Sequence, residues 1–369
     1  MRVLINGSVL DDKPSGVGIY ALSVINEFIK SANQNIDFTL ITPRNRFVEH
    51  LDIRKIYISS KMKSSEKGKL SGFYRLLWNL FVYPFYLKKF DLGYSPTSHG
   101  AMFSNNQIIT IHDLIALNYP NQHWLQYYYF KICIPMWLKF TKKIITISLE
   151  TKSDILSCFN CSANKIEVIY NGFDKRDKKI ANANQYVKNK FDFDNFILTI
   201  GAAYPHKNIE SLIRSFNDLE DKVQNKYKLV ICGSKNHHTQ LLEDLVLQLG
   251  LSNQIVFTGY ISKEDLSCFY CAADLFVFPS MYEGFGFPPL EAMSYECPVI
   301  ASDIPIFHEI YGDAVMYFEL GNKVDLSKKI SNALSIDDNS ELINKGSQRI
   351  KLYSWEKCGA EILFQIKNN

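Results

Sequence analysis

The chain has 369 residues, with 41 Lys and Arg against 38 Asp and Glu, and a formal net charge of +3. This length exceeds one ordinary hydrophobic core and suits two α/β domains, while the balanced charge argues against nucleic acid as the main partner. The opening MRVLING is predicted to form a strand rather than a secretion signal, and no stretch reaches the roughly 18 apolar residues of a membrane span. We therefore expect a cytoplasmic protein without a transmembrane helix.

Short β-branched runs bounded by turn residues recur in the first half, and stretches with helical periodicity separate several of them. The predicted strands are 2–6, 38–42, 107–111, 143–147 and 165–169. This alternation is typical of parallel βαβ construction. Residues 1–180 are therefore predicted to form one open, twisted sheet with helices on both faces.

A polar and charged segment, residues 172–195, has no long apolar face and is predicted to contain the linker. A second doubly wound domain is predicted over 181–352, and residues 353–369 are expected to return to the N-terminal domain with a helix over 355–367. Because ligands of open parallel sheets bind at the carboxyl ends of the strands, two such domains predict a cleft with one ligand on each side. The predicted strands of the second domain are 196–201, 228–233, 255–259, 275–280 and 298–302.

Two Cys-x-x-Cys spacings, Cys158/Cys161 and Cys268/Cys271, together resemble a four-cysteine zinc site. Each pair lies within a helical pattern, however, and a long run of regular alternating structure separates the two pairs. The eight cysteines of a cytosolic chain are better interpreted as reduced thiols. No Asp-x-Asp pair follows a predicted strand, so we predict neither a metal site nor a cofactor.

The most informative segment is SMYEGFGFPPLEAM at 280–293, directly after an apolar strand. Glycines 284 and 286 permit close approach of the backbone to a ligand, and the paired prolines suit the first turn of a helix. The amides of such a helix start attract anions, so a diphosphate is predicted there. Glu283 in the loop and Glu291 in the first helical turn would accept hydrogen bonds from hydroxyls of the same ligand. The alternative interpretation of each is a helix cap or a surface acid.

Glu283 and Glu291, with seven residues between them inside EGFG and LEAM, resemble the signature of the retaining family 4 glycosyltransferases. The resemblance extends over nearly the whole chain. It implies a GT-B fold, a nucleotide-sugar donor in the C-terminal domain and an acceptor in the N-terminal domain. The other segments that resemble the family are SGVGIY at 15–20, TIHDL at 110–114, IITIS at 144–148, VIYNGFD at 168–174, PHKN at 205–208 and the run from 257 to 302.

The resemblance also implies individual roles. Glu291 would bind the ribose hydroxyls, Glu283 the transferred sugar, and Lys207 the diphosphate, whose growing charge a fixed ammonium stabilises in the transition state. Many relatives place an arginine where this chain has Ala202 or His206, and His206 is a candidate for part of the missing charge. Lys207 also has the alternative interpretation of a solvated lysine at a helix start. The implied donor-binding set is Gly16, Gly18, His206, Lys207, Glu283, Gly284, Phe285, Gly286, Phe287 and Glu291.

In the N-terminal half, Gly16 and Gly18 follow the first strand in a loop that would face the donor phosphate and the acceptor. His112 ends a predicted strand and resembles a sugar-contacting histidine of the family, while Tyr20 and Asp113 are assigned to the acceptor or the cleft. Each has a structural alternative, a lone histidine above all. With Lys207 and Glu283, His112 completes the implied catalytic set. No residue stands out as a covalent nucleophile, and the family implies front-face substitution in which the departing phosphate helps to remove the acceptor proton.

Aromatic and basic residues are concentrated at 75–90 and 123–143, beside a basic loop at 61–69. Such faces can rest on an anionic bilayer, where a lipid-linked acceptor would arrive; the alternative is that the aromatic residues pack into the domain core. Our hypothesis is peripheral contact with an anionic membrane, at the inner face of the cell membrane.

The sequence thus favours transfer of a hexose or deoxyhexose from a nucleotide sugar, with GDP-mannose as the first guess, to a lipid-linked oligosaccharide of a surface polysaccharide. Two alternatives stay open. One is a sugar-nucleotide 2-epimerase of the same fold, which would need no acceptor. The other is a catalytically silent binding subunit.

Overall fold

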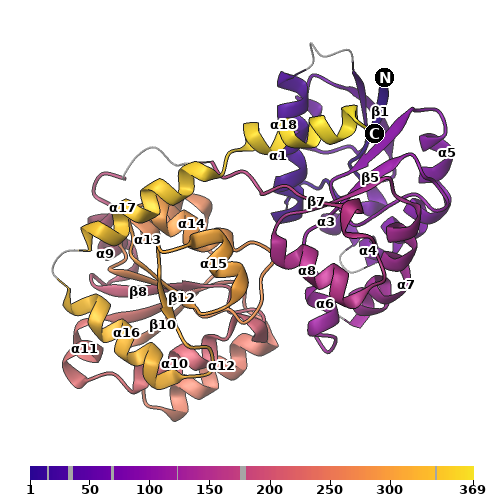
Figure 1. Ribbon diagram of the computed structural model, residues 1–369. Helices are drawn as coiled ribbons and strands as arrows, with labels where there is room; N and C mark the ends of the chain where they lie inside the picture. The colour runs from indigo at the N-terminus through magenta and orange to yellow at the C-terminus, as the bar shows by residue number, and fades with distance from the viewer. Residues whose placement is uncertain (15, 32–35, 68–69, 123, 175–179, 337–338) are drawn as a thin grey trace. The chain divides into compact units, whose positions relative to one another are not determined.

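The computed structural model describes residues 1–14, 16–31, 36–67, 70–122, 124–174, 180–336 and 339–369 (Figure 1). The chain divides into two compact units. Unit 1 comprises Met1–Gly172 and Tyr353–Asn369, and unit 2 comprises Phe173–Leu352.

Unit 1 is built on a seven-stranded sheet in which each described pair of neighbours runs parallel. The strand order is β3-β2-β1-β4-β5-β6-β7. The strands are β1 Arg2–Asn6, β2 Asp37–Pro43, β3 Arg54–Ile58, β4 Leu92–Ser95, β5 Gln107–Ile111, β6 Lys143–Thr146 and β7 Ile166–Val168.

Helices cover both faces of this sheet because its strands are apolar on both sides. On one face, Phe28 of α1 stacks on Phe38 of β2 at 5.0 Å between ring centroids. On the other, Trp137 of α7 packs with Ile109 and Ile144 of β5 and β6. The described helices of unit 1 are α1 Gly16–Lys30, α2 Arg46–Glu49, η1 Ser60–Met62, α3 Ser64–Lys67, α4 Leu70–Phe81, α5 Tyr83–Leu87, α6 Ile115–Asn118, α7 Trp124–Phe140, α8 Leu149–Cys158, η2 Ala163–Lys165 and α18 Trp355–Lys367.

Unit 2 repeats this plan with a six-stranded parallel sheet in the order β10-β9-β8-β11-β12-β13. Its strands are β8 Phe196–Ile200, β9 Lys228–Cys232, β10 Ile255–Gly259, β11 Leu275–Phe278, β12 Val299–Ser302 and β13 Met316–Phe318.

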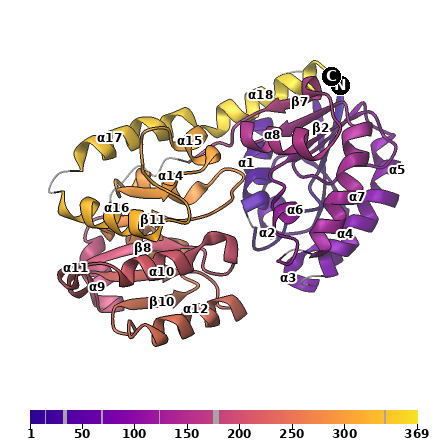
Figure 2. The same cartoon turned by 60° about the horizontal axis from the view of Figure 1, so that its bottom comes forward.

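The two faces of the unit 2 sheet bury alternate residues of its strands, and helices lie on both sides (Figure 2). Leu275 and Val277 of β11 belong to the core beneath α10, α12 and α16. Phe276 and Phe278 point the other way, toward Tyr270 of α13 and Phe307 of α15. The described helices are α9 Ala183–Phe191, η3 Pro205–Lys207, α10 Ile209–Asn217, α11 Asp221–Lys226, α12 His237–Gln248, α13 Lys263–Ala272, α14 Phe287–Ser294, α15 Pro305–Tyr311, α16 Lys323–Ser335, α17 Ser340–Arg349 and η4 Ile350–Leu352.

Every strand predicted from the sequence is present, and so is the helix at 355–367, but three strands escaped prediction. β3 is half-exposed at the edge of its sheet, β4 contains Gly93, and β13 has three residues. Edge position, an internal glycine and short length each weaken the periodic pattern from which strands are predicted.

The segment predicted as a linker is partly helical. Residues 175–179 lie outside the described residues, but α9 occupies 183–191, where its Ala183 and Val187 are buried. The helix packs on α13, and Tyr186 donates to Asp265 at 2.6 Å. The buried Ala183 and Val187 are therefore enough to pack this helix onto the unit, although the polar composition of the segment gave no sign of a helix.

The chain leaves unit 1 and re-enters it at neighbouring points. Gly172 lies so close to the backbone and indole of Trp355 that a Cβ at position 172 would collide with them. Tyr170 and Tyr353 meet edge to face, with ring centroids 6.0 Å apart. Helix α18 then packs along α1.

We predict that Gly172→Ala destabilises unit 1 by about 1–3 kcal/mol, because the added methyl group must displace backbone atoms. Gly72→Ala is the matched control: a Cβ at Gly72 of α4 meets open space, so the change should be neutral or stabilising. Denaturant unfolding measures both. Equal stability of the two variants would contradict the proposed close packing of Gly172.

Candidate functional site

The strand order of unit 2 reverses between β8 and β11, which are parallel neighbours. In open α/β sheets ligands bind outside the carboxyl ends of the strands at such a reversal. The loop after β8 leads through η3 to Lys207, and the loop after β11 carries Glu283. A backbone hydrogen bond from Met281 to the carbonyl of His206, 2.8 Å long, joins the two loops.

The two loops bring Lys207 and Glu283 into direct contact. The ammonium Nζ lies 2.5 Å from Oε1 of the carboxylate, and the two side chains are 19% and 14% exposed. Lys207 Nζ also lies 5.4 Å from the centre of the Phe278 ring. Gly201 has a φ of +101°, which favours glycine, and its Cα side faces the stem of Lys207, since a Cβ there would be in ordinary contact with Lys207 Cγ at 3.4 Å. A cation and an anion are thus fixed side by side at the switch point.

Tyr311 holds the glycine-rich loop in place through a hydrogen bond to its backbone. Gly286 has a φ of +85°, and its carbonyl accepts a 2.7 Å hydrogen bond from the Tyr311 hydroxyl. A Cβ at position 286 would collide with that hydroxyl, so only glycine fits. Helix α14 starts at Phe287, but Pro288 and Pro289 carry no N–H. Donors for an anion must therefore come chiefly from the loop amides up to Phe287 rather than from the whole first turn.

Glu291 lies in the second turn of α14, not in the first turn as predicted. It is the fifth residue of the helix, so it is beyond the first turn, which contains no acidic residue. The two prolines start the helix earlier than the loop pattern indicated. Its Oε2 accepts a 2.9 Å hydrogen bond from Tyr270 of α13, a tyrosine that is 1% exposed and stacks on Tyr295. The described contacts thus give the two glutamates different partners, Lys207 and Tyr270.

His206, the neighbour of Lys207, is buried at the site. Its ring stacks on Tyr204 with centroids 5.5 Å apart, and its carbonyl accepts hydrogen bonds from the loop after β11. The contacts described for it therefore join the two loops. Ala202, at the other position of the family's arginine, is buried against Gly233.

In unit 1, His112 follows β5 at the carboxyl edge of the sheet. Its Nε2 lies 2.9 Å from the carbonyl of Pro96, which only an N–H can satisfy, so Nδ1 is the acceptor nitrogen. Burial lowers the pKa of His112 to about 4, against an opposing effect of the Pro96 bond. The imidazole is therefore neutral near pH 7, with Nδ1 as its hydrogen-bond acceptor.

The other predicted residues of unit 1 have visible structural partners. Tyr20 is 2% exposed, lies edge-on to His112 at 4.7 Å, and has its hydroxyl 3.2 Å from that of Tyr94. Asp113 accepts a 3.0 Å hydrogen bond from the amide of Ile115 at the start of α6. Gly16 begins α1, and Gly18 faces Pro14 closely. Tyr20 thus lies buried against the ring of His112.

The described residues contain no group of three or more His, Cys, Asp or Glu side chains that could hold a metal ion. All eight cysteines are free thiols. Across the described helices, none combines the length and apolar character needed to cross a membrane.

Comparison with known families accounts for both units. The family described as "Glycosyl transferases group 1" matches residues 182–349, and "Glycosyltransferase Family 4" matches residues 14–177. The chain belongs to the group 1, family 4 glycosyltransferases. This confirms the family to which the motifs of the sequence pointed.

Relatives of this glycosyltransferase include the O-antigen chain mannosyltransferase RfbU of Salmonella typhimurium, 33% identical over 242 residues. That alignment spans 66% of this chain and 65% of RfbU. The O-antigen chain mannosyltransferase B of Escherichia coli is 26% identical over an alignment 383 residues long, which covers 96% of each chain. Among solved structures, Anabaena HepE in complex with UDP and glucose superposes with a TM-score of 0.74 at 16% identity, and both chains are covered fully. The predicted fold of two parallel-sheet domains is confirmed.

Tyr270 and Tyr311 were missed by the sequence analysis. Tyr270 stands in the helical segment first considered for zinc, and Tyr311 stands well beyond the glycine-rich loop that it supports. Neither position carries a local pattern, because each acts through a residue distant in the sequence.

The lowered pKa of His112 predicts a pH-dependent stability. Between pH 6.5 and about 4, the unfolded chain binds a proton at this histidine that the folded chain does not, so the free energy of unfolding falls on acidification. His112→Gln should remove about one proton from the pH slope of denaturant unfolding in this window. At pH 8 the variant should remain folded, since both side chains are neutral and Gln can donate to Pro96. Identical slopes for the two proteins would refute the assignment.

Proposed function

We propose that this protein is a retaining glycosyltransferase that moves a hexose or deoxyhexose from a nucleotide sugar to a lipid-linked oligosaccharide in O-antigen or capsule synthesis. The observation that carries the proposal is the Lys207–Glu283 pair at the switch point of unit 2. A diphosphate leaving group needs a fixed cation. The sugar beside it needs a group that accepts hydrogen bonds from its hydroxyls. The pair supplies both at one place.

In this proposal unit 2 binds the donor. Lys207 contacts the diphosphate, Glu283 the transferred sugar and Glu291 the ribose, while the amides of Gly284 to Phe287 reach sugar and phosphate. The ammonium stabilises charge that grows on the leaving phosphate, so it acts more strongly on the transition state than on the bound donor. The departing phosphate oxygen helps to take the acceptor proton, and configuration is retained by front-face attack.

Unit 1 binds the acceptor in this proposal, and Gly16 and Gly18 at the start of α1 permit close approach of a ligand to the backbone. His112 contributes a neutral Nδ1 that accepts a hydrogen bond from a sugar hydroxyl. Tyr20 keeps the imidazole of His112 in place, and Asp113 accepts the hydrogen bond that starts α6. GDP-mannose is the first donor to test, because the names of two relatives describe O-antigen chain mannosyltransferases.

We predict that Lys207→Gln and Glu283→Gln each lower kcat about 100- to 1,000-fold, the loss typical when one group that stabilises developing charge is removed. Transfer from GDP-mannose to a lipid-linked acceptor, followed by product analysis, measures this. Lys188→Gln is the control, since Lys188 of α9 forms an exposed ion pair with Asp194, which follows that helix. A thermal-shift series with GDP, UDP and dTDP identifies the base.

Different results would support the alternatives. Donor conversion to an epimer without any glycan would favour the 2-epimerase. Undetectable transfer by the wild-type protein with every nucleotide sugar that stabilises it would favour the silent subunit. Full activity of Lys207→Gln would refute the role of the ion pair.

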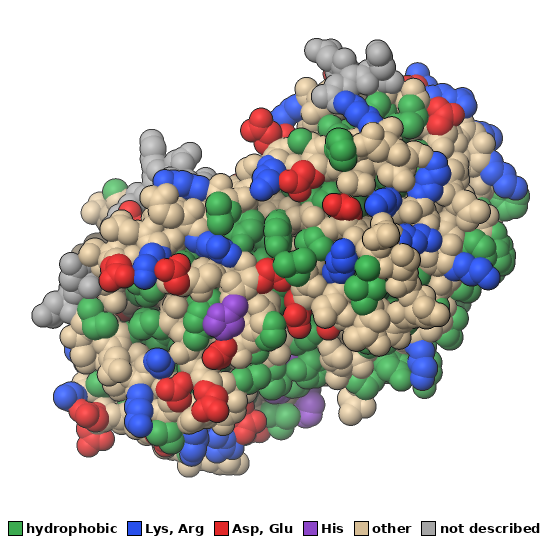
Figure 3. Space-filling model, viewed as in Figure 1, with side chains coloured by type: hydrophobic (Ala, Val, Ile, Leu, Met, Phe, Trp, Pro, Cys, Tyr) green, Lys and Arg blue, Asp and Glu red, His purple; other side chains and the backbone are tan. Residues whose placement is uncertain are grey.

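We further propose that unit 1 contacts an anionic membrane at the inner face of the cell membrane. Large apolar side chains of α4, α5 and α7 are exposed, among them Phe81, Phe85, Trp124 and Ile132. In Figure 3 hydrophobic side chains gather along the right-hand edge, where α5 and α7 lie, with Lys and Arg side chains among them. Apolar groups flanked by lysines suit the interface of an anionic bilayer. Part of the aromatic set, including Trp78 and Trp137, packs inside the unit as the alternative interpretation required.

The double variant Phe85→Ser/Trp124→Ser should reduce binding to phosphatidylserine vesicles about tenfold or more, because each aromatic ring buries substantial apolar area. Co-sedimentation at low salt measures it, and binding of the wild-type protein should weaken as salt increases. Leu247→Ser, an equally exposed site on α12, is the control. Wild-type protein that stays in the supernatant at low salt would refute membrane contact.

A further inference from the structure

The strand order of unit 1 also reverses, between β1 and β4, and the proposed reaction uses none of the polar side chains there. The loop after β1 carries Asp11 and Asp12, and the loop after β4 carries Thr97 and His99. Arg75 of α4, the helix that precedes α5 and β4, completes the group. This is the place where a ligand of unit 1 is expected.

Arg75 is the unusual member of this group. Its Nη1 donates to two neutral acceptors, the carbonyl of Met62 at 3.1 Å and the hydroxyl of Ser64 at 3.5 Å. Its Nε is buried and has no acceptor among the described residues. Within the same described ranges, no carboxylate forms an ion pair with this guanidinium. Desolvating a guanidinium without a bonded anion is costly, so the arrangement calls for a function.

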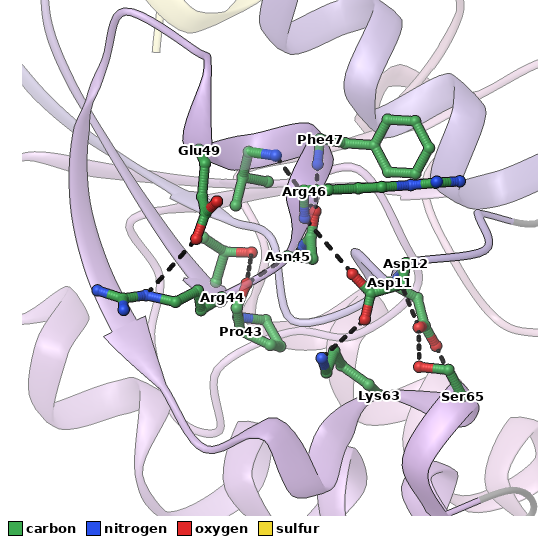
Figure 4. Close-up of polar contacts among 12 residues, drawn as sticks. Asp11, Asp12, Pro43, Arg44, Asn45, Arg46, Phe47, Glu49, Lys63 and Ser65 are labelled. Atoms are coloured by element: carbon green, nitrogen blue, oxygen red, sulfur yellow. Dashed lines mark hydrogen bonds and ion pairs between the residues drawn. The ribbon is translucent and has the colours of Figure 1, made fainter.

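The nearby carboxylates are already engaged (Figure 4). Asp11 accepts hydrogen bonds from the hydroxyl of Ser65 at 2.5 Å, from its amide at 3.0 Å and from the amide of Asp12 at 2.7 Å. Asp12 is paired with Lys63 at 2.8 Å. Asp11 acts on Arg75 only through its field: burial lowers the pKa of Arg75, and the charge of Asp11 opposes this. Asp11 thus partly offsets the charge of the guanidinium without occupying its N–H groups.

His99 provides a second polar group close enough to Arg75 for the charge of the guanidinium to act on it. Its Nδ1 lies 3.1 Å from the hydroxyl of Thr97, its ring stacks on Tyr129 at 5.4 Å, and its Nε2 has no partner among the described residues. Burial, and then the charge of Arg75, lower the pKa of His99 to about 3. The imidazole is neutral and, with Nδ1 as acceptor from Thr97, can donate a hydrogen bond from Nε2.

We propose that Arg75 and His99 bind an oxyanion, a phosphate or a carboxylate, at the β1–β4 switch point of unit 1. The N–H groups of a guanidinium match the oxygens of a phosphate and of a carboxylate, and charge-assisted hydrogen bonds strengthen the binding of either anion. Resting on the proposed function, we assign this oxyanion to the acceptor, either to the phosphate that links a glycan to its lipid or to an acidic sugar. The site thereby selects a charged acceptor over a neutral glycan.

Binding is tested on the full chain by thermal unfolding with inorganic phosphate and with acetate, each compared with chloride at equal ionic strength. A specific site gives a rise in midpoint that saturates with concentration, whereas general salt effects do not saturate. The saturable rise should persist in Arg54→Gln, an exposed arginine of unit 1, and in Lys207→Gln, which removes the cation of unit 2. In the Lys207→Gln background, where unit 2 has lost its cation, it should vanish when Arg75→Gln is added. The anion that gives the rise identifies phosphate or carboxylate.

No saturable rise in the wild-type protein with either anion overturns the proposal, and so does a rise that is unchanged when Arg75→Gln is added to Lys207→Gln. If Arg75→Gln does not fold, Arg75→Lys should keep a rise of weaker apparent affinity, because an ammonium lacks the fork. With a charged acceptor, Arg75→Gln should raise the acceptor KM about ten- to a hundredfold and leave the donor KM unchanged. Anion binding without any transfer would overturn the proposed function and leave the oxyanion site intact.

Discussion

Every described strand runs parallel to its neighbours, and this one constraint organises both units. A parallel neighbour can be reached only by a crossover, so helices must cover the sheet, and all strands end at the same edge. Polar loops therefore collect at that edge. Where the strand order reverses, the helices diverge to opposite faces and the loops of two central strands lie open side by side.

Unit 2 exploits this edge with opposite charges. The loops after β8 and β11 hold Lys207 and Glu283 against each other, and both side chains stay partly exposed to solvent. An ion pair in such a position holds two long side chains in one arrangement at modest energetic cost. In the proposed function, its members bind a ligand that carries both an anionic group and hydroxyls, as a nucleotide sugar does.

Unit 1 treats charge differently at the corresponding edge. The carboxylates after β1 are taken up by hydrogen bonds and by Lys63, and Arg75 keeps N–H groups without a bonded carboxylate. His112 and His99 are held neutral by burial. The two units therefore offer chemically distinct edges, one with an ion pair and the other with a guanidinium that has no carboxylate bonded to it among the described residues.

The sequence alone determined the fold class, ten of the strands, the C-terminal helix and the segment 280–293, because strand periodicity, glycines and prolines act on the local chain. It placed Glu291 too early in its helix and overlooked α9, since two prolines and one short apolar stripe are weak local signals. Only the tertiary structure decided the partners: Lys207 contacts Glu283 from 76 positions away, Tyr270 contacts Glu291, and Arg75 has no bonded carboxylate within the described parts of the chain. Such pairing depends on which strands become neighbours, and strand order is set by packing of the whole sheet rather than by any local stretch.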